Sequence, residues 1–210
     1  SGLRMWRVDY CNASMYAHSE DRMGLAVYSS RNVLIEGLEI SETGGDGVLL
    51  VGVQDTYIKN VTTDGAYRNG LSIVGARNLL VEDCVFGNSG SKGKYNGGET
   101  LNSATGGTAP RAGVDVEPDT ASQILIDITL RRVTVFGSSD DAFDVSAGKA
   151  FAEPVDVTFD DCTARDCSGS WGSGWAFNSL ASAGSVTLRN SRVTNCPGAA
   201  LLIRSGAAHQ

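Results

Sequence analysis

A short unit, a glycine followed by residues that alternate in polarity, recurs along the chain and constrains the fold more than any other feature. It appears as GLAV from Gly24, GVLL from Gly47 and GLSI from Gly70, so its first two steps are 23 residues each. The unit returns, after longer steps, as GVDV, AFDV, GWAF and ALLI, which begin at Gly113, Ala142, Gly174 and Ala200. A fixed period of this length is typical of repeat architectures.

A second apolar run follows each unit, except the last, and keeps the same spacing. Its central residues align in one column: Ile35, Ile58, Val81, Leu130, Phe159 and Leu188. Both series consist of short β-type runs without helical periodicity, which favours coils that stack on one another. A leucine-rich repeat would need a fixed leucine and asparagine framework that the sequence lacks. We therefore expect an all-β fold, a right-handed parallel β-helix of about six to seven coils over 24–210.

Three stretches make this expectation more specific. GGDGVLL, YRNGLSIV and GTAPRAGVDVEPD resemble the repeats of secreted, pectin-lyase-like carbohydrate-active β-helix proteins. The similarity extends from Gly24 to Arg204. It implies the same fold, a polysaccharide or glycan as partner, and an extracellular or cell-surface location. The fold itself hosts hydrolases, lyases, epimerases and plain scaffolds, so the activity must be argued from the site.

Carboxylates gather in the middle of the chain. Because side chains alternate along a strand, Asp115, Glu117 and Asp144 should face outward while their apolar neighbours face the core. Asp140 and Asp141 come directly before the same strand as Asp144. Crowded carboxylates cannot all ionise easily, so one of them should keep its proton and act as an acid.

The DDA sequence resembles the paired aspartates of polygalacturonase-type β-helix hydrolases, and the resemblance assigns that pair to Asp140 and Asp141. Those enzymes place a third aspartate directly before a repeat glycine, where this chain has Ala112, so Asp115 or Glu117 would replace it. The downstream HG and RxK motifs of those enzymes are missing. We predict Asp115, Asp140 and Asp141 as catalytic residues. The predicted substrate-binding residues are Arg68, Arg111, Glu117, Asp144, Tyr95 and Trp171.

Other functions compete with glycoside hydrolysis. A non-catalytic structural module of an extracellular or filament assembly is the main alternative, since acidic residues on an outer face are often simply solvated. A polysaccharide lyase or epimerase, with Arg111 as base and calcium neutralising a uronate, comes third. We predict no cofactor and no fixed metal site, although GVDVEPD contains oxygen ligands of the kind calcium prefers.

Two segments stand apart from the repeats. Residues 87–112 form a long insertion rich in glycine, asparagine, serine and threonine, which we expect to be a loop beside the acidic cluster. Residues 1–23 precede the coils and are expected to cover a side or an end of the β-helix. An outward apolar stripe over the first coils calls for such a cover or for another chain: Tyr28, Leu49, Val51 and Val74.

Charge and cysteines bear on location and partners. The formal net charge of -7 argues against nucleic acid as a partner, and no apolar run approaches the length of a membrane helix.

Cys167 and Cys196 fall on adjacent coils, where a disulfide is expected. Cys84 and Cys162 should be free core thiols. Sequons at Asn12 and Asn60 predict N-glycosylation, and together these features predict secretion. Further β-helix coils or other chains are expected at the ends.

Overall fold

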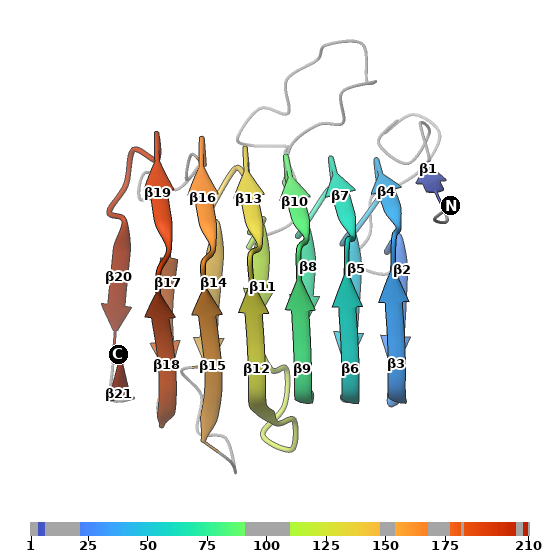
Figure 1. Cartoon of the computed structure of the whole chain (residues 1–210), viewed down its shortest axis with the longest axis horizontal. Helices are drawn as coiled ribbons and strands as arrows, with labels where there is room; N and C mark the ends of the chain where they lie inside the picture. The colour runs from blue at the N-terminus through green and yellow to red at the C-terminus, as the bar shows by residue number, and fades with distance from the viewer. Residues whose placement is uncertain are drawn as a thin grey trace.

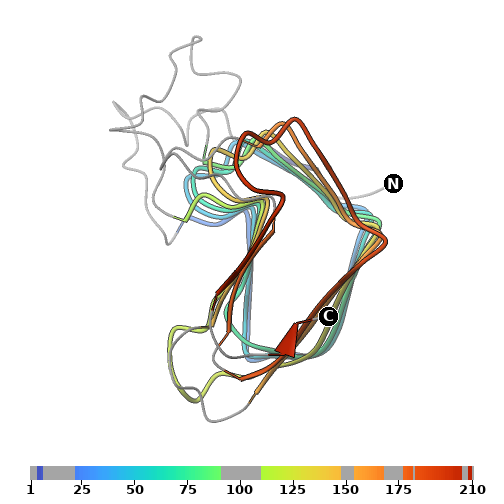
Figure 2. The same ribbon diagram turned by 90° about the vertical axis from the view of Figure 1, so that its left-hand side faces the viewer.

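The computed structural model describes residues 4–6, 22–90, 110–147, 154–167, 177–181, 183–204 and 208–209. Their strands form three parallel sheets that the chain visits in turn, once per coil, and each sheet has seven strands. Figure 1 shows the coils side by side along the long axis, and Figure 2 shows them superposed when viewed along that axis. The predicted all-β parallel β-helix of six to seven coils is confirmed.

Sheet 1 is built from the glycine-led units. Its strands, in order, are β2 (Leu25–Tyr28), β5 (Val48–Val51), β8 (Leu71–Ile73), β11 (Val114–Val116), β14 (Phe143–Ala147), β17 (Phe177–Ala181) and β20 (Leu201–Arg204). The glycine before each of β2, β5, β8 and β11 has a packing reason. A Cβ on Gly113 would lie 2.1 Å from Cγ1 of Val135, so the coil closes this tightly only with glycine there.

Sheet 2 contains the second apolar series, and sheet 3 closes each coil. Sheet 2 consists of β3 (Arg31–Glu36), β6 (Val53–Lys59), β9 (Ala76–Glu82), β12 (Leu125–Arg131), β15 (Val155–Asp160), β18 (Gly184–Arg189) and β21 (Ala208–His209). Sheet 3 consists of β1 (Arg4–Trp6), β4 (Glu39–Ser41), β7 (Thr62–Asp64), β10 (Val85–Gly87), β13 (Thr134–Phe136), β16 (Thr163–Arg165) and β19 (Arg192–Thr194).

The register of sheet 2 reproduces the predicted column. Ile35 pairs with Ile58, and the pairing continues through Val81, Leu130 and Phe159 to Leu188. The members of this column up to Phe159 are buried. The even spacing of apolar residues in the sequence therefore fixes how coils stack, because each apolar side chain packs on its counterpart one coil away.

One predicted alignment is wrong. The GWAF unit at Gly174 was expected to align Trp175 with Phe143, but the structure pairs Phe177 with Phe143. Aromatic packing explains the shift of two residues. The rings of Phe143 and Phe177 stack with centroids 4.7 Å apart, and Phe159 packs edge-on against both.

Each coil turns its corners with single residues in the left-handed conformation. After sheet 2, positive φ angles occur in one column, which consists of Gly37, Asn60, Asp83, Arg132, Asp161 and Asn190. After sheet 3 they recur at Glu42, Gly65, Asn88, Gly137, Asp166 and Asn195. Asparagine, aspartate and glycine tolerate this conformation best, which explains their abundance at the turns. Asn60, of the second sequon, is exposed at such a corner.

A column of charge runs along the outer edge of sheet 2. Its members pair in register and alternate in sign: Glu36, Lys59, Glu82, Arg131, Asp160 and Arg189. Glu82 is its best-connected member. It accepts hydrogen bonds from Tyr57 at 2.5 Å, from Arg131 at 2.7 Å and from Arg132 at 2.6 Å. These donors lower the pKa of Glu82 to about 2, with the Tyr57 hydroxyl as the largest cause. The hydrogen bond to Glu82 in turn raises the pKa of Tyr57 to about 12.

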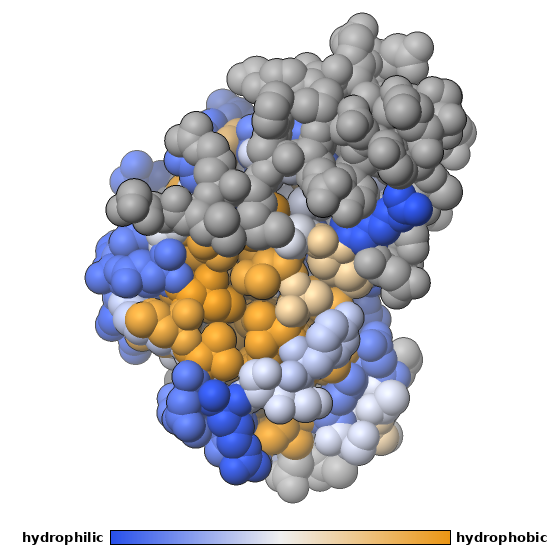
Figure 3. Space-filling model, turned by 90° about the vertical axis from the view of Figure 1, so that its right-hand side faces the viewer, coloured by the Kyte–Doolittle hydropathy of each residue, from blue (hydrophilic) through white to orange (hydrophobic). Residues whose placement is uncertain are grey.

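The first coil presents apolar side chains along the solenoid axis. Figure 3 views this end and shows hydrophobic residues gathered across it. Leu25, Val27, Val33 and Leu38 pack on the core but are only partly buried. β1 extends sheet 3 beyond the first coil by pairing with β4. Most of the expected covering segment 1–23 lies outside the described residues.

The described cysteines are all free thiols, so the predicted Cys167–Cys196 disulfide is not present in the structure. The two residues do occupy equivalent positions on adjacent coils, two residues beyond the paired strands β16 and β19. Burial raises the pKa of the Cys167 thiol, which favours its uncharged form. Cys84 and Cys162 are buried free thiols, as predicted.

Candidate functional site: a groove on sheet 1

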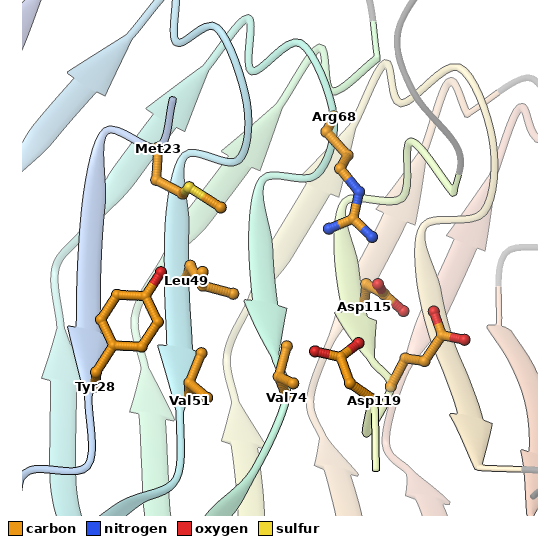
Figure 4. A pocket seen from close by; sticks show the side chains of 9 residues that line it. Met23, Tyr28, Leu49, Val51, Arg68, Val74, Asp115 and Asp119 are labelled. Atoms are coloured by element: carbon orange, nitrogen blue, oxygen red, sulfur yellow. The ribbon is translucent and has the colours of Figure 1, made fainter. Parts of the chain in front are cut away.

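A groove of about 250 Å³ lies on the outer face of sheet 1, across strands β2, β5, β8 and β11. Its two ends differ chemically. One end is apolar and the other holds three carboxylates and an arginine; the full lining consists of Met23, Tyr28, Leu49, Val51, Val74, Arg68, Asp115, Glu117 and Asp119. Figure 4 shows Arg68 pointing toward Asp115 at the charged end, with Tyr28 and Leu49 at the other.

Asp115 is the most unusual residue in this groove. The alternation of β11 turns it outward, as predicted, yet its side chain is buried with only 3% of its surface exposed. Oδ2 accepts a hydrogen bond from Nδ2 of Asn69 at 3.1 Å. Oδ1 is also buried and has no hydrogen-bond partner in the part of the chain that the structure describes. A buried carboxyl oxygen without a partner is costly, so it needs explanation.

The electrostatics of Asp115 favour its protonated form. Burial raises the pKa of this carboxyl well above its usual range, and the neighbouring charges of Asp144 and Glu117 raise it further. A protonated carboxyl has one donor. Because Oδ2 already accepts from Asn69, the proton belongs on Oδ1, where it can be given to a ligand in the groove.

Asn69 holds this arrangement together across three coils. Its Nδ2 donates to Ser72 Oγ at 2.9 Å as well as to Asp115, and its Oδ1 accepts from the backbone N of Ala112 at 2.9 Å. Its own backbone N donates to Oδ1 of Asp46 at 3.0 Å. Every polar atom of the Asn69 side chain is thus committed, which fixes the orientation of Asp115.

Asp46 and Arg68 form an ion pair beside this network. Nη1 of Arg68 lies 3.2 Å from Oδ2 of Asp46, which is fully buried. Burial raises the pKa of Asp46 even though Arg68 opposes that shift. The guanidinium also lines the groove, where its charge is paired with Asp46.

The predicted pair Asp140 and Asp141 lies beyond the groove. Neither is among its described lining residues, and the same holds for Arg111 and Asp144. Asp141 and Asp144 are buried, so the expected open acidic ledge is instead a mostly buried cluster. Burial raises the pKa of Asp140, opposed by the positive charge of Arg111. Asp144 remains close in register, since β11 and β14 pair Asp115 with Asp144.

The apolar end is formed by the predicted outward stripe. Leu49 and Val74 are buried on the floor of the groove, Val51 is partly buried, and Tyr28 is 57% exposed at its rim. These residues come from three neighbouring strands or their ends, β2, β5 and β8. The stripe is therefore one continuous surface with the charged end.

Sequence reasoning missed Asp46, Asn69, Ser72 and Asp119 as members of the site. Asp46 and Asn69 both come directly before a repeat glycine, in the column where the hydrolases resembled above carry an aspartate, and this was the available signal. Tyr95, Trp171 and Asn12 lie outside the described residues, as does most of the 87–112 insertion. Among the described residues, no group of histidine, cysteine and acidic side chains is arranged to hold a metal ion.

Comparison with known proteins gives a family and one distant relative. Residues 2–109 match the family model described as the right handed beta helix region. The uncharacterized protein YclG of Bacillus subtilis (strain 168) is 25% identical over 119 residues, which cover 51% of this chain and 18% of YclG. No solved structure matches. No helix suited to crossing a membrane occurs in the described part of the chain.

Proposed function

The chain belongs to the right-handed β-helix family, and on that fold we propose a carbohydrate-active protein that binds a polysaccharide in the sheet 1 groove and hydrolyses it. The observation that carries the proposal is the buried Asp115 carboxyl, which lines the groove and whose Oδ1 has no hydrogen-bond partner among the described residues. Since structural polysaccharides lie outside the cell, we include secretion of the protein in the same proposal.

Asp115 acts as the general acid. Glycoside hydrolysis requires a protonated carboxyl that gives its proton to the leaving oxygen, and a second, ionised carboxylate that activates water or attacks the sugar. The raised pKa of Asp115 suits the first role. Its proton passes from Oδ1 to the glycosidic oxygen as the bond to the sugar carbon breaks.

Glu117 is the proposed second carboxylate. It follows Asp115 by two positions, so both face the groove, and their Cα atoms are about 7 Å apart along the extended chain. It is partly exposed, which leaves its carboxylate in contact with water. Arg68 holds sugar hydroxyls, because its pairing with Asp46 leaves little net charge for an anionic group.

The test is hydrolysis of a panel of soluble polysaccharides, such as pectin, xylan, arabinan and mixed-linkage glucan, followed by release of reducing ends. Removal of a general acid lowers kcat about 10²- to 10⁴-fold, so Asp115→Asn should abolish activity in practice, and Glu117→Gln should do the same. Glu36→Gln, at an exposed glutamate on sheet 2, is the matched control and should keep full activity.

A structural module is the second candidate, and the apolar end of the first coil favours it. That surface and the exposed Leu201 and Ile203 of β20 suit contact with further protein. A wild-type protein that hydrolyses no member of the panel, while Asp115→Asn leaves every measured property unchanged, would replace the enzyme proposal with this one.

A further inference from the structure

The groove is amphiphilic, and this property identifies the kind of ligand it takes. Its charged end, at β11, and its apolar rim, at β2, are three strand spacings apart, or about 14 Å. An outer face of a solenoid is ordinarily polar because it meets water. Here Leu49 and Val74 are buried on the floor and Tyr28 stands exposed above them, so the apolar end is built into the concave surface.

An ordinary sugar fits the apolar end poorly. The side chains of Leu49, Val51 and Val74 contain no hydrogen-bonding atom, and a sugar hydroxyl pressed against them would lose its water without a replacement. A hydrocarbon group in the same place gains free energy with every methylene it buries. The ring of Tyr28 offers a further apolar surface at the rim.

The charged end selects against anions. Glu117 and Asp119 line it, and the charge of Arg68 is already matched by Asp46. Asp115, Glu117, Asp119 and Arg68 make this end of the groove polar, which suits sugar hydroxyls and ring oxygens. An added carboxylate would instead meet negative charge at short range.

We propose that the groove recognises a glycoside whose uncharged sugar lies against Asp115, Glu117 and Arg68 and whose apolar substituent, an alkyl, acyl or aryl group, lies on Leu49, Val51 and Val74. The inference rests on the proposed sugar-binding role of the groove and adds the substrate class. It distinguishes this groove from one that binds an unsubstituted polyuronate.

The experiment measures the Kd of methyl, butyl and hexyl β-D-glucosides and β-D-galactosides by titration calorimetry. Each methylene buried on the floor should tighten binding about fourfold, until the floor is full. Val51→Thr combined with Val74→Thr keeps the shape of both side chains but makes the floor polar, and it should flatten this dependence on chain length. Leu34→Ser, at an equally apolar but solvent-facing position on β3, is the control and should behave like the wild type.

A hexyl glucuronide serves as the charge test and should bind more weakly than the hexyl glucoside. The inference is overturned if methyl and hexyl glycosides bind equally, if the double threonine variant keeps the chain-length dependence, or if Leu34→Ser loses it. Hydrolysis of a polysaccharide without any preference for apolar substituents would leave the proposed function standing while this inference fails. If binding tightens with the length of the alkyl chain but no polysaccharide is hydrolysed, this inference stands while the proposed hydrolytic function fails. A thermal melt of each variant confirms that it is folded.

Discussion

Asp115 and Asp144 are direct neighbours across strands β11 and β14, so two acidic side chains share one buried patch of the outer face of sheet 1. The negative charge of Asp144 is the second largest cause, after burial, of the raised pKa of Asp115. Two carboxylates so placed cannot both ionise without cost, and this gives the site its acid.

The stability of the fold should fall with rising pH because of Asp115. A carboxyl whose pKa is raised in the folded state stabilises the fold fully below its unfolded pKa of about 3.9 and loses that contribution as the pH rises through the folded value. Asp115→Asn is neutral at every pH and should be more stable than the wild type at neutral pH, but not at pH 3. Urea unfolding of both proteins at the two pH values measures this. A difference that does not change with pH would contradict the assignment.

Asn69 should be required for both the stability and the pH profile of the site. Asn69→Ala leaves Asp115 Oδ2 and the backbone N of Ala112 buried without a partner, which costs about 1–3 kcal/mol in the free energy of unfolding. Since the lost hydrogen bond favours the ionised form of Asp115, its loss raises the pKa of this general acid, and the basic limb of the pH–rate profile should move to higher pH. Asn78→Gly, which removes an exposed bond to Asp55 and tolerates the left-handed backbone at that position, should change neither.

Glu82 should stabilise the fold at neutral pH and lose that effect in acid. Its folded pKa of about 2 lies below its ordinary value of 4.5, so the contribution is complete above pH 4.5 and disappears as the pH falls toward 2. Glu82→Gln should therefore be less stable than the wild type at pH 6 and approach it near pH 2, as followed by thermal melts. Tyr57→Phe removes one donor and should show a smaller change of the same sign. Equal melting at pH 6 would show that the network contributes nothing.

Cys167 and Cys196 should form a disulfide under mild oxidation. They lie at equivalent positions on adjacent coils, a spacing that suits the bond. Intact mass and peptide mapping after treatment with oxidised glutathione should show one bridge between them. Cys84 and Cys162 provide the internal control, because the coil of Val133 separates them and both should stay reduced. Free thiols at both Cys167 and Cys196 after treatment would remove the predicted bridge.

The stacking of the coils could be predicted wherever the repeat kept its spacing. The column from Ile35 to Leu188 follows directly from aligned apolar residues, and the outward direction of Asp115 follows from strand alternation. The prediction failed at the sixth coil because Gly174 resembles the repeat glycine, whereas the residue that pairs with Phe143 is Phe177. There, the stacking of Phe143 on Phe177 determines the register, and no local pattern reports that contact.

For the site, the direction of the side chains could be predicted from the sequence, but their burial could not. Alternation says which way a side chain points but not how deeply it is buried. The turn before β8 brings Asn69 against Asp115, and the turn before β5 brings Asp46 against Asn69, so residues of two other coils bury this carboxyl. Such lateral packing depends on the path of each turn. The sequence predicted an exposed acidic cluster, whereas the structure shows a buried hydrogen-bond network in which the raised pKa of Asp115 favours its protonated form.

The alternating charges along the edge of sheet 2 limit how a protein of this kind can change its length. Within this column, from Glu36 to Arg189, each charged residue pairs with residues of opposite sign on the adjacent coils. Deleting the single coil that carries Lys59 would stack Glu36 on Glu82, and inserting one copy of any coil would place two like charges in contact. Deleting or duplicating two successive coils keeps the order intact. Gene duplication in this solenoid is therefore expected to proceed in steps of two coils.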